Sequence, residues 1–284
     1  MLIKISELGE VEDIGSYGDV SSSSIGYSVK QTIDGGYIVC GTIMHEDQQN
    51  IFDENLRDVF LVKTDSQLQE EWNKKINITY ESDTIFYPDK EIYWTDTQES
   101  GYDIQLTNDG KYIICGEIYS SGKQNILLLK IDENGNTIWS KVYDNDCSLE
   151  SWSGGYSAQQ TDDNGYIISG WGYISDDCSY SLLIIKTYAN GNISWEKSFN
   201  YFGGSFSPGQ HVQQTDDGGY IVCGSFITGG NNINVVLLKL DSNGDTLWDE
   251  EYLLFPDYPN IENDMFAHSV QQTDDNGYII CGTR

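Results

Sequence analysis

The segment GYDIQLTNDGKYIICGE (101–117), followed by NILLLKIDENGNTIWSKVY (125–143), decides the fold because both motifs recur along the chain. The first motif occurs five times, beginning at Gly26, Gly101, Gly155, Gly209 and Ala267. The second motif follows the first four copies, beginning at Asp58, Asn125, Ser181 and Asn234. Self-similarity with a period of roughly 20–50 residues is typical of solenoids, propellers and related arrays.

Each pair of motifs predicts four β-strands. In the first motif an Asp-Gly, Asn-Gly or Gly-Gly turn joins two strands, since these dipeptides supply the positive φ that tight hairpins need. In the second motif a turn such as DENG joins a nearly continuous apolar strand to one that alternates polar and apolar residues. The first kind of strand is buried on both faces, and the second lies half exposed on the outside. Each pair therefore predicts a four-stranded antiparallel blade.

The two ends of the chain each carry half of a pair. The fifth first motif ends the chain at Arg284, and residues 1–18 align with LLKIDENGNTIW through Lys4, Ile5 and Gly9. We predict a single all-β domain over residues 1–284, a five-bladed β-propeller closed by a blade that the N- and C-termini share. The blades span approximately 26–79, 101–144, 155–200, 209–252, and 267–284 with 1–18. The alternative is an open array of such units cut from a longer protein.

The charge balance limits the partners. The chain has 15 Lys and Arg against 45 Asp and Glu, a formal net charge of −30. Such a surface repels nucleic acid and anionic membranes. It suits solubility, adaptation to salt or cold, or attraction of Ca²⁺ or a cationic partner. No apolar run reaches the length of a membrane span, and the start of the sequence has no apolar signal region. We therefore expect no membrane insertion and a monomer, either cytoplasmic or a mature piece whose signal was removed.

The motifs DGGYIVCG and LLLKIDENGNTIW resemble tandem-repeat β-propellers of bacteria and archaea, many of them exported or attached to the cell surface. The second motif is also distantly similar to the repeats of pyrroloquinoline-quinone-type propellers, whose Trp docks between blades. The resemblance covers nearly the whole chain. It implies the propeller fold and suggests an extracellular location, with a cytoplasmic one left open. It brings no shared catalytic residues and no quinone site, so we predict no cofactor.

The repeated aromatic residues and cysteines are expected to be structural. Inter-blade packing is predicted for Tyr37, Tyr112, Tyr166, Tyr220 and Tyr278 and for Trp72, Trp139, Trp195 and Trp248. Small, buried, free thiols are predicted for Cys40, Cys115, Cys223 and Cys281, because stacked sheets lie about 10 Å apart and a disulfide needs Cα atoms within roughly 7 Å. Cys147 and Cys178 lie in loops at one edge, where a disulfide is geometrically possible and would imply an oxidising compartment. Free thiols at these two positions are the alternative.

Acidic turns raise the question of a metal. Residues 162–163, 216–217 and 274–275 are each Asp-Asp. Their spacing does not match the EF-hand pattern of alternating ligands followed by a bidentate Glu. Asp at a turn usually caps its own backbone. Ca²⁺ is therefore conceivable but unsupported, and the metal assignment stays open.

The long loops between blades hold the candidate ligand-binding residues. Aromatic side chains beside carboxylates suit sugar stacking, or equally a protein partner, and the alternative is that the rings cap the blade ends. These candidates are Tyr87, Tyr93, Trp94, Trp152, Trp171, Phe255 and Tyr258. Asp103, His211 and His268 stand at the start of the innermost strand of their blades. A His–Asp pair there would bind a metal or transfer protons, against a simple polar lining.

A non-enzymatic binding module, recognising a glycan or protein ligand through the loop-rich face, is the preferred function. The alternatives are a glycoside hydrolase-like enzyme with a central-channel site and a ligand-free scaffold. No Ser-His-Asp, HExxH, CxxC or phosphate-loop motif is present. Glycoside hydrolysis needs two carboxyl groups at a set separation, and the innermost strands offer mainly Asp103. The sequence thus argues against an enzyme more than for one.

Overall fold

The computed structural model describes residues 1–18, 22–45, 56–78, 97–120, 123–144, 152–173, 180–200, 209–227, 233–252 and 265–283. The chain divides into two compact units, Met1–Ser140 and Lys141–Arg284. The regular elements of the described residues are all strands, so they include no helix that could cross a membrane.

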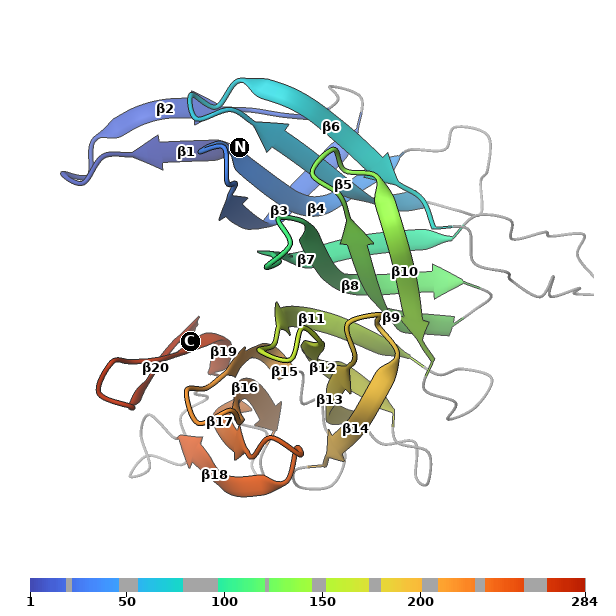
Figure 1. Ribbon diagram of the computed structural model, residues 1–284, viewed down its shortest axis with the longest axis vertical. Helices are drawn as coiled ribbons and strands as arrows, with labels where there is room; N and C mark the ends of the chain where they lie inside the picture. The colour runs from blue at the N-terminus through green and yellow to red at the C-terminus, as the bar shows by residue number, and fades with distance from the viewer. Residues whose placement is uncertain are drawn as a thin grey trace, which may run out of the picture. The chain divides into compact units, whose positions relative to one another are not determined.

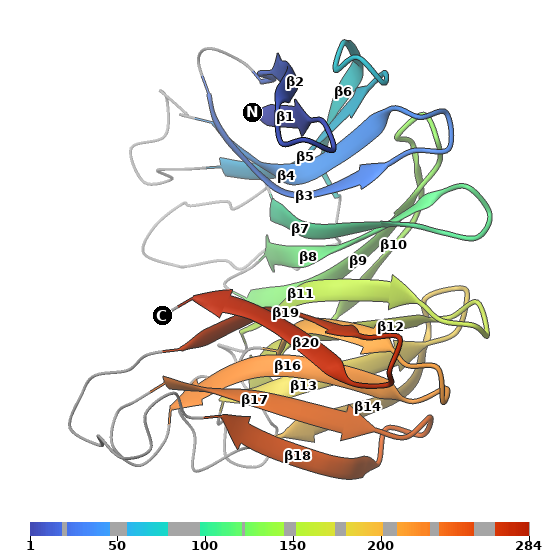
Figure 2. The same cartoon turned by 90° about the vertical axis from the view of Figure 1, so that its left-hand side faces the viewer.

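The first unit contains two complete blades and one two-stranded sheet (Figure 1). Its strands are β1 (Leu2–Ile5), β2 (Val11–Gly15), β3 (Ser23–Gln31), β4 (Tyr37–His45), β5 (Leu56–Thr64), β6 (Glu70–Ile76), β7 (Gln98–Leu106), β8 (Tyr112–Ser120), β9 (Lys123–Ile131) and β10 (Thr137–Tyr143), whose last residues pass the unit boundary. The blades have the orders β3-β4-β5-β6 and β7-β8-β9-β10, and β1 pairs with β2. The β3–β4 and β7–β8 turns lie at one edge of this unit (Figure 2).

The second unit repeats this plan. Its strands are β11 (Ser153–Gln160), β12 (Tyr166–Tyr173), β13 (Tyr180–Thr187), β14 (Ile193–Phe199), β15 (Gly209–Gln214), β16 (Tyr220–Ile227), β17 (Ile233–Leu240), β18 (Thr246–Tyr252), β19 (Phe266–Gln272) and β20 (Tyr278–Thr283). Two blades have the orders β11-β12-β13-β14 and β15-β16-β17-β18, and β19 pairs with β20. The all-β class and the four-stranded antiparallel blade are therefore confirmed. β1–β2 and β19–β20 each form a two-stranded sheet of their own, so the predicted fifth blade, shared between the termini, is not confirmed.

Burial follows the sequence pattern. β9 and β17 are buried along nearly their whole length, whereas β14 and β18 are largely exposed. Within each unit the first strand of a blade packs on the blade before it: β7 on β3, β4 and β5, β15 on β11, β12 and β13, and β19 on β15, β16 and β17. Apolar strands that are covered on both faces thus form the core between blades.

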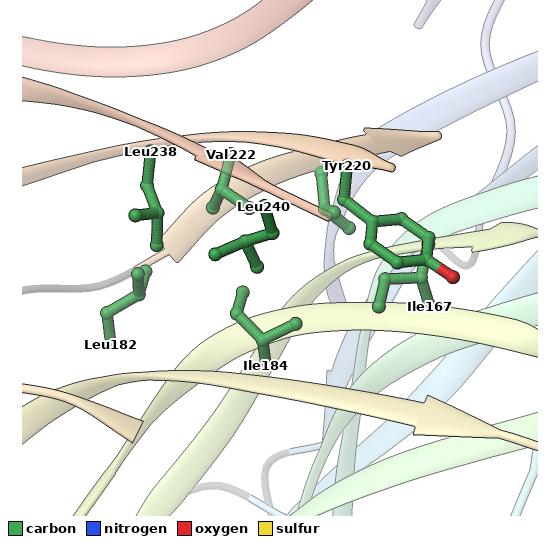
Figure 3. Packing of buried hydrophobic residues seen from close by; sticks show 8 residues of the cluster. Ile167, Leu182, Ile184, Tyr220, Val222, Leu238 and Leu240 are labelled. Carbon is green, nitrogen blue, oxygen red and sulfur yellow. The ribbon is translucent and has the colours of Figure 1, made fainter. Parts of the chain in front are cut away.

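Aromatic residues fill these junctions as predicted. In the second unit, Ile167, Leu182, Ile184, Val212, Tyr220, Val222, Leu238 and Leu240 form one buried cluster against Trp195 (Figure 3). The Trp195 ring meets Tyr220 edge-on, with 5.9 Å between ring centroids. Trp248 and Tyr278 make the equivalent contact at 5.8 Å in the next junction. The tryptophan on the fourth strand of a blade thus packs on the tyrosine of the second strand of the following blade.

The repeated cysteines are free, and three of them are buried. Cys281 is exposed, contrary to the prediction of a buried residue. The reason is local: β20 is the outer strand of a two-stranded sheet, whereas Cys40, Cys115 and Cys223 lie on strands flanked on both sides.

Glutamines join the innermost strands of the second unit. Gln159 Oε1 accepts a hydrogen bond from Gln214 N at 2.7 Å, and Gln213 Oε1 accepts one from Gln272 N at 2.8 Å. In return, Gln214 Oε1 accepts from Asp162 N at 2.9 Å and Gln272 Oε1 from Asp216 N at 3.0 Å. Each first strand is the edge of its sheet, so these side chains satisfy backbone groups that have no ladder partner. We call this reciprocal pair of bonds the glutamine staple.

Candidate functional site

Every innermost strand carries a β-bulge at the same repeat position. The register shifts fall between Gly26 and Ser28, Gly101 and Asp103, Gly155 and Ser157, Gly209 and His211, and Ala267 and Ser269. The extra residue is Tyr27, Tyr102, Tyr156, Gln210 or His268. Bulges re-aim side chains and are enriched beside active sites. This edge of each blade, opposite the tight turn between its first and second strands, is therefore where the repeat can present chemistry.

Three positions per blade meet at the bulge. They are the bulged residue, the residue after it, and the residue that follows the invariant glycine of the second strand. We call them the rim triplet. The five triplets are Tyr27/Ser28/Thr42, Tyr102/Asp103/Glu117, Tyr156/Ser157/Trp171, Gln210/His211/Ser225 and His268/Ser269/Thr283. They differ in chemistry although the strands around them repeat closely.

The bulge explains the glycine that precedes the third position. A Cβ atom at Gly116 would lie 1.8 Å from the carbonyl oxygen of Ser100, which the bulge brings close. No rotamer relieves a clash with backbone, so this position accepts only glycine. The rim triplet therefore rests on a fixed backbone.

The second triplet contains two carboxyl groups. Asp103 pairs with Cys115 in the β7–β8 ladder, and Glu117 follows two residues later on the same face of β8. The register therefore places Asp103 and Glu117 on one face of the β7–β8 pair as diagonal neighbours.

Glu117 is held in a defined position. Tyr102 Oη donates to Glu117 Oε1 at 2.7 Å, and Gln124 Nε2 donates to Glu117 Oε2 at 2.5 Å. The side chain is only 14% exposed, and Arg57 Nη1 lies 3.9 Å from Oε1. Burial raises the pKa of the Glu117 carboxyl, although Tyr102, Arg57 and Gln124 act in the opposite direction. A raised pKa in a buried carboxyl is a property of general acids.

Asp103 is oriented by neutral donors. Ser28 Oγ, from the first strand of the preceding blade, donates to Asp103 Oδ1 at 3.0 Å. Gln105 Nε2 lies 3.0 and 3.1 Å from the two carboxylate oxygens. The Asp103 carboxylate is therefore fixed from both its own blade and the neighbouring one.

An aromatic surface adjoins these groups. Tyr27 is 49% exposed, and its ring meets the edge of the Tyr102 ring with 5.1 Å between centroids. Tyr102 in turn bonds Glu117. The exposed Tyr27 ring thus stands one residue away from the buried acid. We call Tyr27, Ser28, Arg57, Tyr102, Asp103, Glu117 and Gln124 together the Glu117 site.

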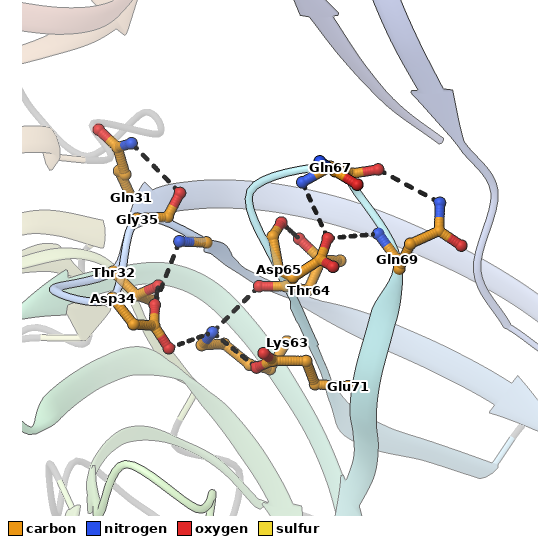
Figure 4. A network of polar contacts seen from close by, with 11 residues as sticks. Gln31, Thr32, Asp34, Gly35, Lys63, Thr64, Asp65, Gln67, Gln69 and Glu71 are labelled. Atoms are coloured by element: carbon orange, nitrogen blue, oxygen red, sulfur yellow. Dashed lines mark hydrogen bonds and ion pairs between the residues drawn. The ribbon is translucent and has the colours of Figure 1, made fainter.

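The acidic turns at the other edge are structural. Asp34 bonds Thr32 and Gly36 N, and Lys63 Nζ lies 2.9 Å from Asp34 Oδ2 and 2.8 Å from Glu71 Oε2 (Figure 4). The same Thr–Asp–Lys arrangement joins Asp109 to Lys130, Asp163 to Lys186 and Asp217 to Lys239, with N–O distances of 2.8–2.9 Å. The expected backbone caps are confirmed at Gly165, Gly219 and Gly277. Among the described residues, no group of three or more His, Cys, Asp or Glu is arranged to hold a metal ion.

The other predicted site residues separate into three groups. Tyr87, Tyr93, Trp94, Phe255, Tyr258, Cys147 and Cys178 lie outside the described residues. Trp152 is exposed, and Trp171 is buried as the third member of its rim triplet. His211 occupies the position of Asp103, and His268 that of Tyr102, with His268 Nε2 3.0 Å from Thr283 Oγ1. A His–Asp pair stays a prediction.

Glu117 is the residue that the sequence analysis missed. Its signal was visible, because the motif ends in CGE at 115–117 where the other copies have CGT, SGW, CGS and CGT. The relation of this carboxylate to Asp103 becomes visible only from the register of β7 against β8. The one-residue register shift at the bulge cannot be recognised from the order of polar and apolar residues.

The comparisons with known proteins bear on the fold. No family model matches the chain, and no curated protein matches it. A protein of unknown function from Dyadobacter fermentans is similar in structure over 86% of this chain and 68% of its own, with 11% identity and a TM-score of 0.51. A β-1,2-mannobiose phosphorylase from Listeria innocua, in complex with β-1,2-mannobiose, is similar over 92% of this chain and 87% of its own, with 11% identity and a TM-score of 0.50. An endo-arabinase from Bacteroides thetaiotaomicron is similar over 90% and 87%, with 12% identity and a TM-score of 0.47.

These neighbours correct the functional prediction. The sequence favoured a non-enzymatic binding module, and the likeness to the mannobiose phosphorylase contradicts that preference. The sequence argument against an enzyme counted carboxylates on the innermost strand alone. A second carboxylate stands on the neighbouring strand, at the third position of the same rim triplet.

Proposed function

We propose that the chain is a glycan-cleaving enzyme of the glycoside hydrolase type, with Glu117 as general acid and Asp103 as its partner carboxylate. The observation that carries the proposal is the buried, doubly hydrogen-bonded Glu117 on the same sheet face as Asp103. The likeness to the mannobiose phosphorylase supports it, because that protein places carbohydrate chemistry on a similar fold.

The roles follow from the two environments. Burial raises the pKa of Glu117, so this group is suited to keep a proton for the glycosidic oxygen that leaves. Asp103, oriented by Ser28 and Gln105, is suited to activate a water molecule on the opposite side of the sugar.

The test is hydrolysis of a panel of oligosaccharides by the wild-type chain and by Glu117→Gln, Asp103→Asn and Glu133→Gln. Glu133 lies exposed in the β9–β10 turn and serves as the matched control. Losing a general acid or base typically costs about 10²–10⁴-fold in rate, so we expect such losses in kcat/KM for the first two variants and none for the third. Absence of cleavage by the wild-type chain, or full activity of Glu117→Gln, would overturn the proposal. Circular dichroism of each variant separates lost chemistry from lost folding.

We also propose that the chain closes into a five-bladed propeller in which β1–β2 complete the blade of β19–β20. Val29 is 45% exposed and Ile279 is 61% exposed, although their repeat equivalents are buried. In the second unit the equivalent residues pack together across a junction: Ile167 with Val212, and Ile221 with Val270. The repeat therefore favours Ile279 and Val29 as the corresponding pair of a fifth junction.

A charge pair supports the same closure. Asp275 bonds Thr273 and Gly277 N, as its equivalents do, but no lysine of the described residues pairs with it. Lys4 stands at the motif position of Lys63, Lys130, Lys186 and Lys239. It lies 3.2 Å from Glu12 in the first unit. By equivalence with the other blades, we expect Lys4 to form an ion pair with Asp275 in the closed propeller.

A double-mutant cycle tests the closure. We expect Asp275→Ala and Lys4→Met to be non-additive in urea unfolding, as for residues in contact. Light scattering on the same samples must show a monomer. Additive effects, or coupling that appears only in oligomers, would refute a ring closed within one chain.

A further inference from the structure

Arg57 stands out from the other cations of the chain. It is one of two arginines in a sequence whose other basic residues are 13 lysines. The four repeat lysines are buried and lie 2.8–2.9 Å from their aspartates. The Arg57 side chain is 44% exposed, and its Nη1 lies 3.9 Å from Glu117 Oε1, beyond hydrogen-bond distance.

Glu117 does not require Arg57 as a hydrogen-bond donor. Both of its oxygens already accept, one from Tyr102 and the other from Gln124. Within the part of the chain that the structure describes, the guanidinium makes no hydrogen bond, so its planar set of donors stays available beside the acid. That geometry matches a carboxylate in two-point contact, which a lysine cannot reproduce.

An exposed aromatic ring is linked to this cation through Tyr102 and Glu117. The exposed Tyr27 ring contacts Tyr102, and Tyr102 bonds the same Glu117 oxygen that Arg57 faces. An aromatic face stacks on a sugar ring, while a guanidinium binds an acidic substituent of that ring. The combination is selective for a sugar that carries a carboxylate.

We infer that the Glu117 site accepts a glycan with one carboxylate-bearing sugar, whose ring stacks on Tyr27 and whose carboxylate pairs with Arg57. The inference rests on the proposed function, since it names the substrate class of the same site. A bound carboxylate near Glu117 would further favour the protonated acid, because like charges disfavour ionisation. The correct substrate would thus help to prepare the acid that cleaves it.

The net charge restricts the glycan further. A chain with a formal charge of −30 repels long polyanions. At about 0.1 M salt, charges more than roughly 10 Å apart are largely screened, so a single acidic sugar senses Arg57 more than the distant carboxylates. We therefore assign the site to a largely neutral glycan with an isolated uronic acid, not to a polyuronate.

The experiment uses Glu117→Gln, which removes turnover and leaves binding to be measured. A glycan array presents acidic oligosaccharides, each beside the same molecule with its carboxyl reduced to an alcohol, together with polyuronates. The best pair is then measured by titration calorimetry. Hydrogen bonds to charged groups are worth about 1.5–3 kcal/mol, so we expect the acidic member to bind roughly 10- to 150-fold more tightly.

Variants assign the two contacts. Adding Arg57→Gln should abolish the preference for the acidic member, and Arg57→Lys should restore part of it. Tyr27→Ala should weaken both members by a similar factor, while Tyr27→Phe should bind like the parent. Lys75→Gln, which changes an exposed residue of β6, and Tyr188→Ala, which changes an exposed residue of the β13–β14 turn in the second unit, serve as controls.

The outcomes separate this inference from the proposed function. It is overturned if no acidic member binds preferentially, if the preference survives Arg57→Gln, or if polyuronates bind best. It stands if the preference follows Arg57 while the wild-type chain cleaves no glycan, which would refute only the proposed function. Equal cleavage of neutral and acidic substrates by wild type and Arg57→Gln would refute the inference alone.

Discussion

Two kinds of junction join innermost strands in this protein. In the second unit, β11 to β15 and β15 to β19 are joined by glutamine staples. In the first unit the equivalent positions at the β3–β7 junction are Lys30 and Leu106, and Ser28 bonds Asp103 instead. The same backbone frame therefore carries a structural bond in one unit and a pair of carboxylates with their supports in the other. The Glu117 site thus lies at the junction where residues of the repeat do not form the glutamine staple.

The largest effect should come from Asp103→Asn. Asparagine still accepts from Ser28 but cannot act as a base, so we expect kcat/KM to fall by about 10²–10⁴-fold with little change in thermal stability. Steady-state kinetics and a melting curve on one preparation check both statements. A large drop in melting temperature would show that the first-unit junction is structural as well.

Gln213→Ala should lower stability and leave activity unchanged. It leaves the Gln272 N–H at a strand edge without its acceptor, and an unsatisfied group of this kind costs about 1–3 kcal/mol. Urea unfolding measures the loss, and kcat/KM should remain unchanged. Gln69→Ala, in an exposed turn, is the matched control. Equal stability of the two variants would mean that water replaces the staple without cost.

Grafting the staple into the first unit gives a smaller effect. Lys30→Gln with Leu106→Gln places both glutamines where Gln159 and Gln214 stand in the second unit. If Leu106 N and Ile33 N then find acceptors, each single variant should gain about 0.5–1.5 kcal/mol, and the double variant should gain the sum of the two. Urea unfolding of all four proteins measures these gains. Absence of a gain in both single variants would show that the first-unit junction does not form the staple.

The smallest difference between the units is expected in acid. A hydrogen bond from Thr215 and another from Lys239 lower the pKa of Asp217 to about 2, and Asp34 of the first unit also has a pKa of about 2. These values lie below that of an unfolded Asp, about 3.9. The stabilisation is therefore complete above about pH 4 and is lost as the pH falls towards 2.

Both units should lose stability over this same interval in urea unfolding followed against pH. Thr215→Val removes the largest cause of the shift, so it should weaken the dependence on pH, whereas Thr137→Val on β10 should not. Loss of stability in only one unit would show that the Thr–Asp–Lys arrangements are not equivalent.

Local patterns predicted the blades, and nonlocal geometry placed the site. Turn dipeptides and apolar runs are properties of a few adjacent residues, so the four-stranded blades and the Trp195–Tyr220 contact followed from the motifs. The Lys63–Asp34 pair joins residues from different motifs, 29 positions apart, and neither motif alone reveals it. The bulge at Tyr102 depends on a one-residue register shift. Without knowledge of this register shift, the sequence alone gives no reason to distinguish Glu117 from the other acidic residues of the chain.

The bulge has a consequence for how such a protein changes. The five copies keep the same ladder and the same glycine before the third position although their rim triplets differ, so the side chains of a rim triplet can be exchanged without altering the ladder. Each blade thus offers an interchangeable socket, separate from the residues that specify folding. Duplication of one blade can therefore supply a stable frame first, and new specificity can arise afterwards by substitutions at three positions.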